Sequence, residues 1–488
     1  MKKVVIVGAG LGGLSAGIKL AASGFSVTIV DKNNHTGGKM MPVQLGEYSF
    51  DFGPNTITMP DVFKRVFEEV GENPEEYLQF EQITDHTKNW YMDGTSFLQT
   101  TNIEKMESIL SSIDRYSFKN YHRYLSETKH LYQLSEKHFF SRTFSSVKDY
   151  LSPSLATALM RVRPLESMDH FHRRFFKDER VLMAFNRYAT YIGSSPYSCP
   201  ATFSLIGYLE MVDGVYYTKG GNTSIASSFT ELFKKVGGNL LLDTEVTSLI
   251  IDHKLVRGVK LAGGEKLEAD LVILNGDLLT SYSHLLAETD RPHMDNRKIA
   301  SFEPSISAFV MMAGVNKTFK EFVHHQVYFT SDYRKEFQQI FIDKKLPDDP
   351  TIYICNSSAT DPNRTKGSNL FILVNAPANP NMSHQEIVEY KGKIYSKLKQ
   401  FGIDISPHLE EEMVVTPNYI KTQFNAYKGA LYGISSHRKK DAFLRPFNRD
   451  PAIKNLFFTG GTTHPGGGSP MVTLSGMNTA ELILKNLF

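Results

Sequence analysis

Three glycines near the start of the chain have the spacing of a loop that binds a dinucleotide. Gly8, Gly10 and Gly13 form the pattern G-x-G-x-x-G, which follows an apolar run over residues 4–7. The first glycine permits a tight turn, the second lets the backbone approach a pyrophosphate, and the third lets a helix pack close to a strand. The helix that follows, predicted over residues 15–22, directs its N-terminus at the negative charge.

An acidic residue follows the glycines at the distance expected for ribose binding. A second predicted strand over residues 25–30 ends at Asp31. This aspartate lies roughly 20 residues beyond the glycines, where a carboxylate can accept a hydrogen bond from a ribose hydroxyl. The alternative is a chance glycine-rich turn with a surface aspartate, but strand, glycines, helix, strand and acid all occur in order. We therefore predict a dinucleotide site here.

Three later segments favour FAD over NAD. Gly37-Gly38-Lys39 can bring backbone N–H groups and a cation to the cofactor phosphates. Residues 50–54 (FDFGP) form a stiff turn suited to a loop beside a flavin. The glycines of residues 460–471 open a final helix and can approach a ring or a phosphate without obstruction by side chains.

Several titratable residues need a separate interpretation. His464, in the last glycine-rich turn, could move protons or polarise a flavin ring, but it could equally fix the loop by packing, and we favour packing. For Asp51 we favour a hydrogen bond that stabilises its loop. His324 and His325 are adjacent in a strand-like run, so their side chains should point to opposite faces, and we expect no metal site there.

Composition places the chain among ordinary globular proteins. Of its 488 residues, 41% are hydrophobic and 22% charged, with a net charge of +2, so we expect two or three domains and no nucleic-acid partner. Cys199 and Cys355 have neither disulfide nor metal-site spacing, which fits a reducing cytoplasm. Glycines interrupt the first apolar run, so we expect a strand rather than a signal peptide. No run of about 18 apolar residues predicts a membrane span.

The order of predicted elements indicates a discontinuous cofactor domain. Residues 61–214 are mostly helical, with aromatic residues at three- and four-residue spacing, and residues 215–285 then contain a helix, short alternating strands and a buried-type strand. We predict an α/β fold in which residues 1–60, 215–285 and 435–488 form a Rossmann-like domain. Residues 61–214 and 286–434 would form an inserted mixed α+β domain with a helical layer, which binds substrate and faces the membrane.

Motifs along essentially the whole chain resemble those of the phytoene desaturase family of carotenoid oxidoreductases, flavoproteins with the amine-oxidase-like fold. They are the opening glycines, the Gly-Gly-Lys turn, residues 192–200, 219–221 and 424–429, and the His-Pro-Gly-Gly-Gly segment that begins at His464. The last of these is distinctive. The resemblance implies noncovalently bound FAD in an amine-oxidase-like FAD domain, and a linear polyene as the substrate.

The predicted cofactor contacts combine these motifs. They are Gly8, Gly10, Gly12, Gly13, Asp31, Lys32, Gly38, Lys39, Gly53, Pro54, Val246, Gly461, Gly467, Gly468 and Met471. His464 is the one catalytic candidate, and we predict no metal ligand. Because a long hydrocarbon offers no polar handle, we expect an apolar tunnel with few catalytic side chains, where the flavin takes a hydride while a proton leaves the neighbouring carbon.

Two reactions of this family fit the sequence. Residues 191–200 and 214–222 resemble the desaturase branch that acts on thirty-carbon chains, whereas residues 346–353 and 470–476 resemble the diaponeurosporene oxygenase branch. We place desaturation of a C30 or C40 polyene first and oxygenation of a terminal methyl group second. An amine oxidase commonly has an acidic residue near Gly461, where this chain has none, and a flavin or carotenoid carrier without turnover is the remaining alternative.

The electron acceptor and the membrane are the other predicted partners. The chain has no second G-x-G-x-x-G for NADPH, so we expect electrons to pass to oxygen or a membrane quinone. Residues 168–188 mix basic and aromatic side chains, which suits an interfacial helix of a cytoplasmic enzyme that contacts the membrane peripherally. An ordinary amphipathic helix with its aromatic face in the core is the alternative.

Overall fold

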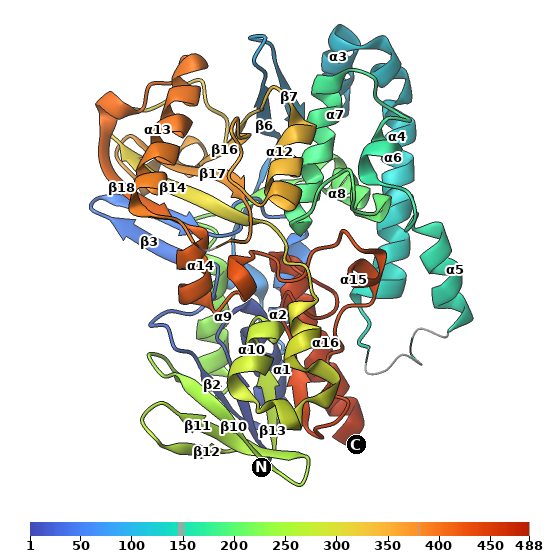
Figure 1. Ribbon diagram of the computed structural model, residues 1–488, viewed down its shortest axis with the longest axis vertical. Helices are drawn as coiled ribbons and strands as arrows, with labels where there is room; N and C mark the ends of the chain where they lie inside the picture. The colour runs from blue at the N-terminus through green and yellow to red at the C-terminus, as the bar shows by residue number, and fades with distance from the viewer. Residues whose placement is uncertain (145–148, 150–151, 380, 488) are drawn as a thin grey trace.

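The chain forms two joined parts, seen in a computed structural model that describes residues 1–144, 149, 152–379 and 381–487. A parallel sheet with its helices lies at one end of the molecule, together with both chain termini, and a larger sheet with a helical layer lies at the other (Figure 1). The domain segments predicted from the sequence also include residues 145–148, 150, 151, 380 and 488, which lie outside the described residues.

The parallel sheet has five strands in the order β19-β13-β1-β2-β9, and every neighbouring pair in it is parallel. Short runs rich in Val, Ile and Leu form these strands, as expected for a sheet that is covered on both faces. The strands are β1 (Lys3–Val7), β2 (Ser26–Val30), β9 (Asn239–Leu241), β13 (Leu271–Leu274) and β19 (Leu456–Phe458). They come from three separated stretches of the chain, and all fall within the segments predicted for the cofactor domain.

Alternate side chains of β1 enter two different apolar clusters. Val4 and Ile6 pack with α1 (Leu11–Ala22), α9 (Ser224–Lys235) and α16 (Ser469–Leu487) on one face. Val5 packs on the other face with α10 (Leu278–Leu285) and with a three-stranded antiparallel sheet, whose strands are β10 (Val246–Asp252), β11 (Leu255–Leu261) and β12 (Lys266–Glu268). The two-residue period of a strand therefore buries both faces of the sheet.

The second sheet has seven strands in the order β18-β14-β17-β16-β15-β6-β7. They are β6 (Asp85–Trp90), β7 (Ser96–Thr100), β14 (Ser307–Val315), β15 (His325–Tyr328), β16 (Ile352–Asn356), β17 (Ser368–Ala376) and β18 (Leu409–Val415). The parallel pair of β15 with β6 joins the two predicted insertions into one sheet, because β6 belongs to the first insertion and β15 to the second. Tyr390 and Ile394 of α13 (His384–Gln400) share an apolar cluster with strands of this sheet.

Smaller elements connect the two parts. The hairpin of β3 (Met41–Leu45) and β4 (Tyr48–Phe52) shares an apolar cluster with β14 and β17, and β5 (Phe80–Ile83) pairs with β8 (Val215–Thr218). The remaining α-helices outside the helical layer are α2 (Pro60–Glu68), α11 (Asn296–Ala300), α12 (Tyr333–Gln338), α14 (Pro417–Phe424) and α15 (Lys439–Phe443).

The helical layer lies beside the seven-stranded sheet (Figure 1). Its helices are α3 (Ile103–Ile113), α4 (Arg115–Ser135), α5 (Pro153–Arg161), α6 (Met168–His172), α7 (Glu179–Asn186) and α8 (Leu205–Tyr208). Aromatic side chains form its core, where the ring of Tyr124 in α4 contacts those of Phe171, Phe175, Phe176 and Phe185. The aromatic spacing seen in the sequence therefore belongs to a packed interior.

Residues 168–188 have the packing of the second interpretation, in which the aromatic side chains face the core. This stretch contains two short helices, α6 and α7, and its Phe171, Phe175, Phe176 and Phe185 are completely buried. Its arginines bind carboxylates of the same region, as in the pair of Arg173 with Asp169 and Glu179. The aromatic side chains of this stretch are therefore part of the protein's own apolar core. Over the part of the chain that the structure describes, no helix is long and apolar enough to cross a bilayer.

Two mid-helix glycines give a matched test of how closely α16 packs against α1. A Cβ atom at Gly476 of α16 would overlap the carbonyl oxygen of Gly12 and the hydroxyl of Ser15 in α1, whereas a Cβ at Gly392 of α13 meets no atom within 4 Å. We expect Gly476→Ala to lower the free energy of unfolding by about 1–3 kcal/mol through overpacking. Gly392→Ala should raise it by up to about 1 kcal/mol through helix propensity. Urea unfolding of both variants measures the difference, and equal effects would contradict the described α1–α16 contact.

Candidate functional site

A cavity of about 520 Å³ opens at the carboxyl ends of the parallel strands. Val7 at the end of β1, Val30 at the end of β2 and Asn275 just after β13 contribute to its wall, together with Gly460 beyond β19. Open parallel sheets bind their ligands at this edge, because the loops that leave the strands diverge there. The three chain segments that build the sheet thus also meet around one cavity.

Two glycines of the first loop, Gly8 and Gly13, have no room for a side chain. Gly8 has a φ of 109°, and a Cβ atom there would overlap the carbonyl oxygen of Asn275. A Cβ at Gly13 would overlap the carbonyl oxygen of Gly8, so the third glycine serves the close packing of α1 on the loop. Gly10 is the N-cap of α1 and carries no capping side chain, which leaves the first N–H groups of the helix free for an anion.

The Asp31 carboxylate is held in place at the cavity wall. It accepts hydrogen bonds from the backbone N–H groups of Ala9, at 2.7 Å, and Asn33, at 2.9 Å. The side chain is largely buried but reaches the cavity. Each carboxylate oxygen accepts one of these bonds and keeps further capacity, so it can accept a ligand hydroxyl as well.

Two lysines bring positive charge to the same cavity. The Lys39 ammonium donates to the carbonyl oxygens of Leu431, at 2.6 Å, and Ala430, at 3.2 Å, and burial lowers its pKa to about 8. Lys32 donates to the carbonyl oxygen of Thr422 and the side-chain oxygen of Asn425, and burial lowers its pKa as well. A bound anion would favour the charged form of both groups.

The residues predicted to bind the cofactor lie mostly around this one cavity. All of them line it except Gly13, which lies behind the loop, and Met471, which lines a second cavity. The sequence interpretation missed Asn275, whose side-chain amide donates to the carbonyl oxygens of Gly8, at 2.9 Å, and Gly10, at 3.3 Å. Its position directly after a buried-type strand was the available signal. Tyr432 was also missed, and no local pattern marks it.

The second cavity, of about 260 Å³, adjoins the first. Both cavities are lined by Gly53, Pro54, Phe371, Leu373, Leu431, Tyr432, Gly467, Gly468 and Ser469. Beyond this shared wall the second cavity is mainly apolar, and it runs between the helical layer and the large sheet. Its apolar lining includes Met59, Phe140, Ile192, Phe203, Leu205, Ile206, Leu209 and Val327.

A buried ion pair lies at one side of the second cavity. Arg187 and Glu210 are 3.9 Å apart, and Tyr191 donates a hydrogen bond to the same carboxylate. Arg187 and Tyr191 line the cavity, while the Glu210 side chain is fully buried behind them, which raises the pKa of its carboxyl group. These groups add a charged pair to the polar part of a mainly apolar cavity.

His464 does not line either cavity. Its Nε2 atom lies 2.7 Å from the carbonyl oxygen of Phe139, and its ring contacts that of Phe144 edge to face. Burial lowers its pKa to about 4, so the ring is neutral at ordinary pH and its N–H donates to the carbonyl. These contacts favour the packing role over proton transfer.

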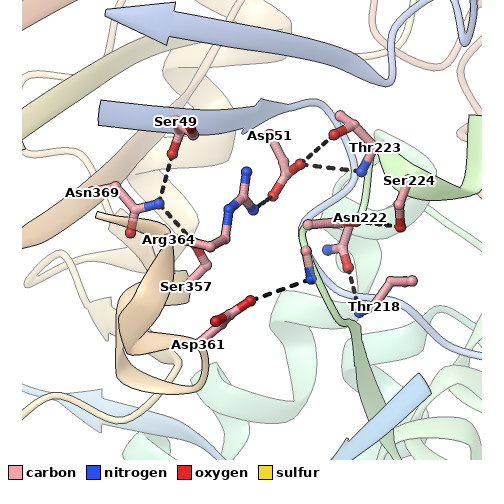
Figure 2. Close-up of polar contacts among 12 residues, drawn as sticks. Ser49, Asp51, Thr218, Asn222, Thr223, Ser224, Ser357, Asp361, Arg364 and Asn369 are labelled. Carbon is pink, nitrogen blue, oxygen red and sulfur yellow. Dashed lines mark hydrogen bonds and ion pairs between the residues drawn. The ribbon is translucent and has the colours of Figure 1, made fainter. Parts of the chain in front are cut away.

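Asp51 ties three segments together through polar contacts (Figure 2). Its carboxylate accepts hydrogen bonds from the N–H and hydroxyl of Thr223, at 3.1 and 2.7 Å, and forms an ion pair with Arg364. Arg364 also donates to the Tyr217 hydroxyl at 3.2 Å. Asp51 thus connects β4 with the start of α9 and with the second insertion, which is more than the local loop contact expected from the sequence.

Comparison with known proteins identifies the family. The family described as flavin containing amine oxidoreductase matches residues 11–484. The chain is 34% identical to a 1-hydroxycarotenoid 3,4-desaturase of Flavobacterium sp., with 99% of each chain covered. It is 31% identical to a 4,4'-diapolycopene oxygenase of Methylomonas sp., with 100% of this chain and 99% of the relative covered. It is 30% identical to a 4,4'-diaponeurosporene oxygenase of Staphylococcus haemolyticus, with 99% and 97% covered.

Solved structures support the fold. Putrescine oxidase bound to putrescine aligns with a TM-score of 0.66 at 14% identity, with 99% of both chains covered. Cyclohexylamine oxidase from Brevibacterium oxydans aligns with a TM-score of 0.62 at 14% identity, with 100% of this chain and 99% of that chain covered. At this level of identity the likeness concerns the fold alone, and the predicted amine-oxidase-like α/β fold is confirmed.

The Asp51–Arg364 pair can be tested by a double-mutant cycle. Asp51→Asn should lower the free energy of unfolding by roughly 3–5 kcal/mol, because it leaves the Arg364 charge buried without a partner. Arg364→Met in the Asp51→Asn background should recover part of that loss, since no unpaired charge then remains buried. Urea unfolding of the two single variants and the double variant measures the coupling. Additive effects of the two changes would contradict a direct interaction.

Proposed function

The chain belongs to the flavin containing amine oxidoreductase family, and we propose that it binds FAD and uses it to oxidise a linear carotenoid. The names of three relatives, covered over nearly their full length, support the substrate class, since all three are carotenoid oxidoreductases. The observation that carries the proposal is the shared wall between the two cavities, which joins the cavity at the glycine loop of α1 to a mainly apolar compartment.

Residues of the first cavity suit the pyrophosphate, a ribose and the flavin ring of FAD. The pyrophosphate would face Gly10 and the N-terminus of α1, where backbone N–H groups and the helix dipole favour negative charge. A ribose would meet the Asp31 carboxylate. Lys39 would add a positive charge to the wall of the same cavity. The flavin ring would then lie at the shared wall, between the Gly53–Pro54 turn and the backbone at Gly467.

The protein itself would contribute to the reaction by positioning the substrate and by excluding water. When bound, flavin supplies hydride-accepting chemistry. The apolar side chains of the second cavity would hold the polyene in an extended form next to the shared wall and exclude water from it. Glycines at positions 467 and 468 let a flat ring and the substrate approach the backbone closely. This arrangement requires no histidine at the reacting carbon, in agreement with the buried position of His464.

Two outcomes of the oxidation are compatible with the chain. Desaturation removes two hydrogens from a C–C bond, and the relative with 34% identity is a desaturase. Oxygenation of a terminal methyl group is the second candidate, favoured by the names of the 31% and 30% identical relatives. We place desaturation first. The proposal includes oxygen or a membrane quinone as the electron acceptor and a peripheral contact with the bilayer that holds the substrate.

Product analysis distinguishes the reactions. We expect a bacterial host that supplies C30 precursors, or separately C40 precursors, to accumulate a carotenoid of altered absorbance when this chain is expressed. Mass spectrometry should show the loss of two hydrogens per step for desaturation, or the addition of oxygen for the second candidate. Unchanged precursor in every host, from cells that contain the flavin-loaded protein, would overturn the enzymatic proposal in favour of a carrier.

The pyrophosphate position can be tested at Gly10. A Cβ atom there approaches only the flexible side chain of Asn275 closely, at 3.2 Å, so Gly10→Ala and Gly10→Val should both fold. The larger side chain should block the approach of the phosphates, so Gly10→Val should lose at least 90% of the bound flavin and Gly10→Ala less. Gly263→Ala, on an exposed turn with no atom within 4 Å of the added carbon, is the control. Absorbance of purified protein measures the flavin content, and full retention by Gly10→Val would refute the assignment.

A further inference from the structure

Two histidines and a cysteine form a compact group in the large sheet. One ligand atom from each of His324, His325 and Cys355 lies within 4.8 Å of the other two, and all three residues are buried. Imidazole nitrogens and a thiolate sulfur are ligands for soft and borderline transition metals. The group lies outside the two cavities, none of whose lining residues it includes.

The sequence had predicted that the two histidine side chains point to opposite faces, and this prediction was wrong. The alternation holds within a strand, but β15 begins at His325, so His324 lies just before the regular strand. The two rings approach to 4.5 Å between centroids. Cys355 faces His325 directly, because these residues are cross-strand partners in the antiparallel pair of β15 and β16.

The unused nitrogen atoms of both rings provide a second, independent observation. Nδ1 of His324 lies 2.6 Å from the Thr360 hydroxyl, and Nδ1 of His325 lies 2.9 Å from the Tyr353 hydroxyl. Nε2 of each ring is buried and has no hydrogen-bond partner among the described residues. In the tautomer whose Nδ1–H donates to the hydroxyl, Nε2 keeps a lone pair. Histidines that bind metals are usually oriented in this way by a second hydrogen bond.

We propose that His324, His325 and Cys355 bind one soft transition-metal ion, and that monovalent copper is the best match. Two neutral imidazoles and one thiolate around Cu(I) make a group of zero net charge, which suits a buried site. Zn²⁺ on the same ligands would leave a buried positive charge. It also usually takes four protein ligands in structural sites, whereas this group offers three among the described residues.

The distances require only a small adjustment. Bonds of about 2.0 Å to nitrogen and about 2.3 Å to sulfur place the ligands of one ion at most about 4.3 Å apart. Rotation of the side chains would bring the three atoms, now within 4.8 Å, to this range. The bound ion would tie β15 to β16 behind Tyr353, which lines the second cavity. The proposed role is structural, and it does not depend on the proposed flavin reaction.

Metal content gives the first test. The full-length protein is purified without oxygen from cells grown with added copper, or separately with added zinc, and metal per chain is measured by mass spectrometry. We expect about one copper per wild-type chain. Cys355→Ser and His325→Gln should each lower this at least tenfold, whereas Cys199→Ser should retain it, because Cys199 is an equally buried thiol outside the group. Circular dichroism checks that the variants fold.

X-ray absorption at the copper edge of the wild-type protein gives a second test, which does not depend on the folding of any variant. We expect one sulfur and two nitrogen ligands. Retention of full copper by Cys355→Ser, a wild-type protein with less than a tenth of an equivalent of either metal, or a spectrum without sulfur would each overturn the site. Stoichiometric zinc lost in the same variants would support the site and overturn the choice of copper.

Discussion

Parallel pairing of β1 with β2 and β13 brings distant parts of the chain to one sheet edge, and the loops at that edge have almost no free space. A side chain at Gly8 would overlap the backbone of Asn275, and one at Gly476 would overlap α1. These close approaches position the N-terminus of α1 at the first cavity. The shape of the cavity, and with it the place for an anionic ligand, therefore depends on contacts that only glycine permits.

In the second part of the molecule, two insertions together enclose one mainly apolar compartment. The pair of β15 with β6 joins the insertions into a single sheet, and the Asp51–Arg364 ion pair connects the second insertion to β4 and α9. Because the ion pair is buried, removal of either partner would leave an unpaired charge and lower the stability of the fold. The adjoining cavities share their wall close to this junction.

The first glycine loop could be predicted because its residues act locally. A glycine spacing reports on turns and close packing within a few residues, so Gly10, Asp31 and Lys39 were identified and line one cavity. Residues 168–188 left two interpretations open, because a run of basic and aromatic residues is typical both of a helix on a membrane surface and of a helix that packs against an aromatic core. The aromatic rings pack around Tyr124, which lies more than forty residues away in the sequence.

The sequence by itself determined the first strand, the glycine turn and the helix that follows it, the α/β class and the family, since each depends on short patterns and their order. Only the tertiary structure decided what lies opposite those patterns. It placed His464 against the Phe139 carbonyl, joined the two cavities at Tyr432 and set Cys355 across from His325. Such contacts join residues far apart in the chain, and their geometry follows from sheet register and side-chain packing, which no local pattern specifies.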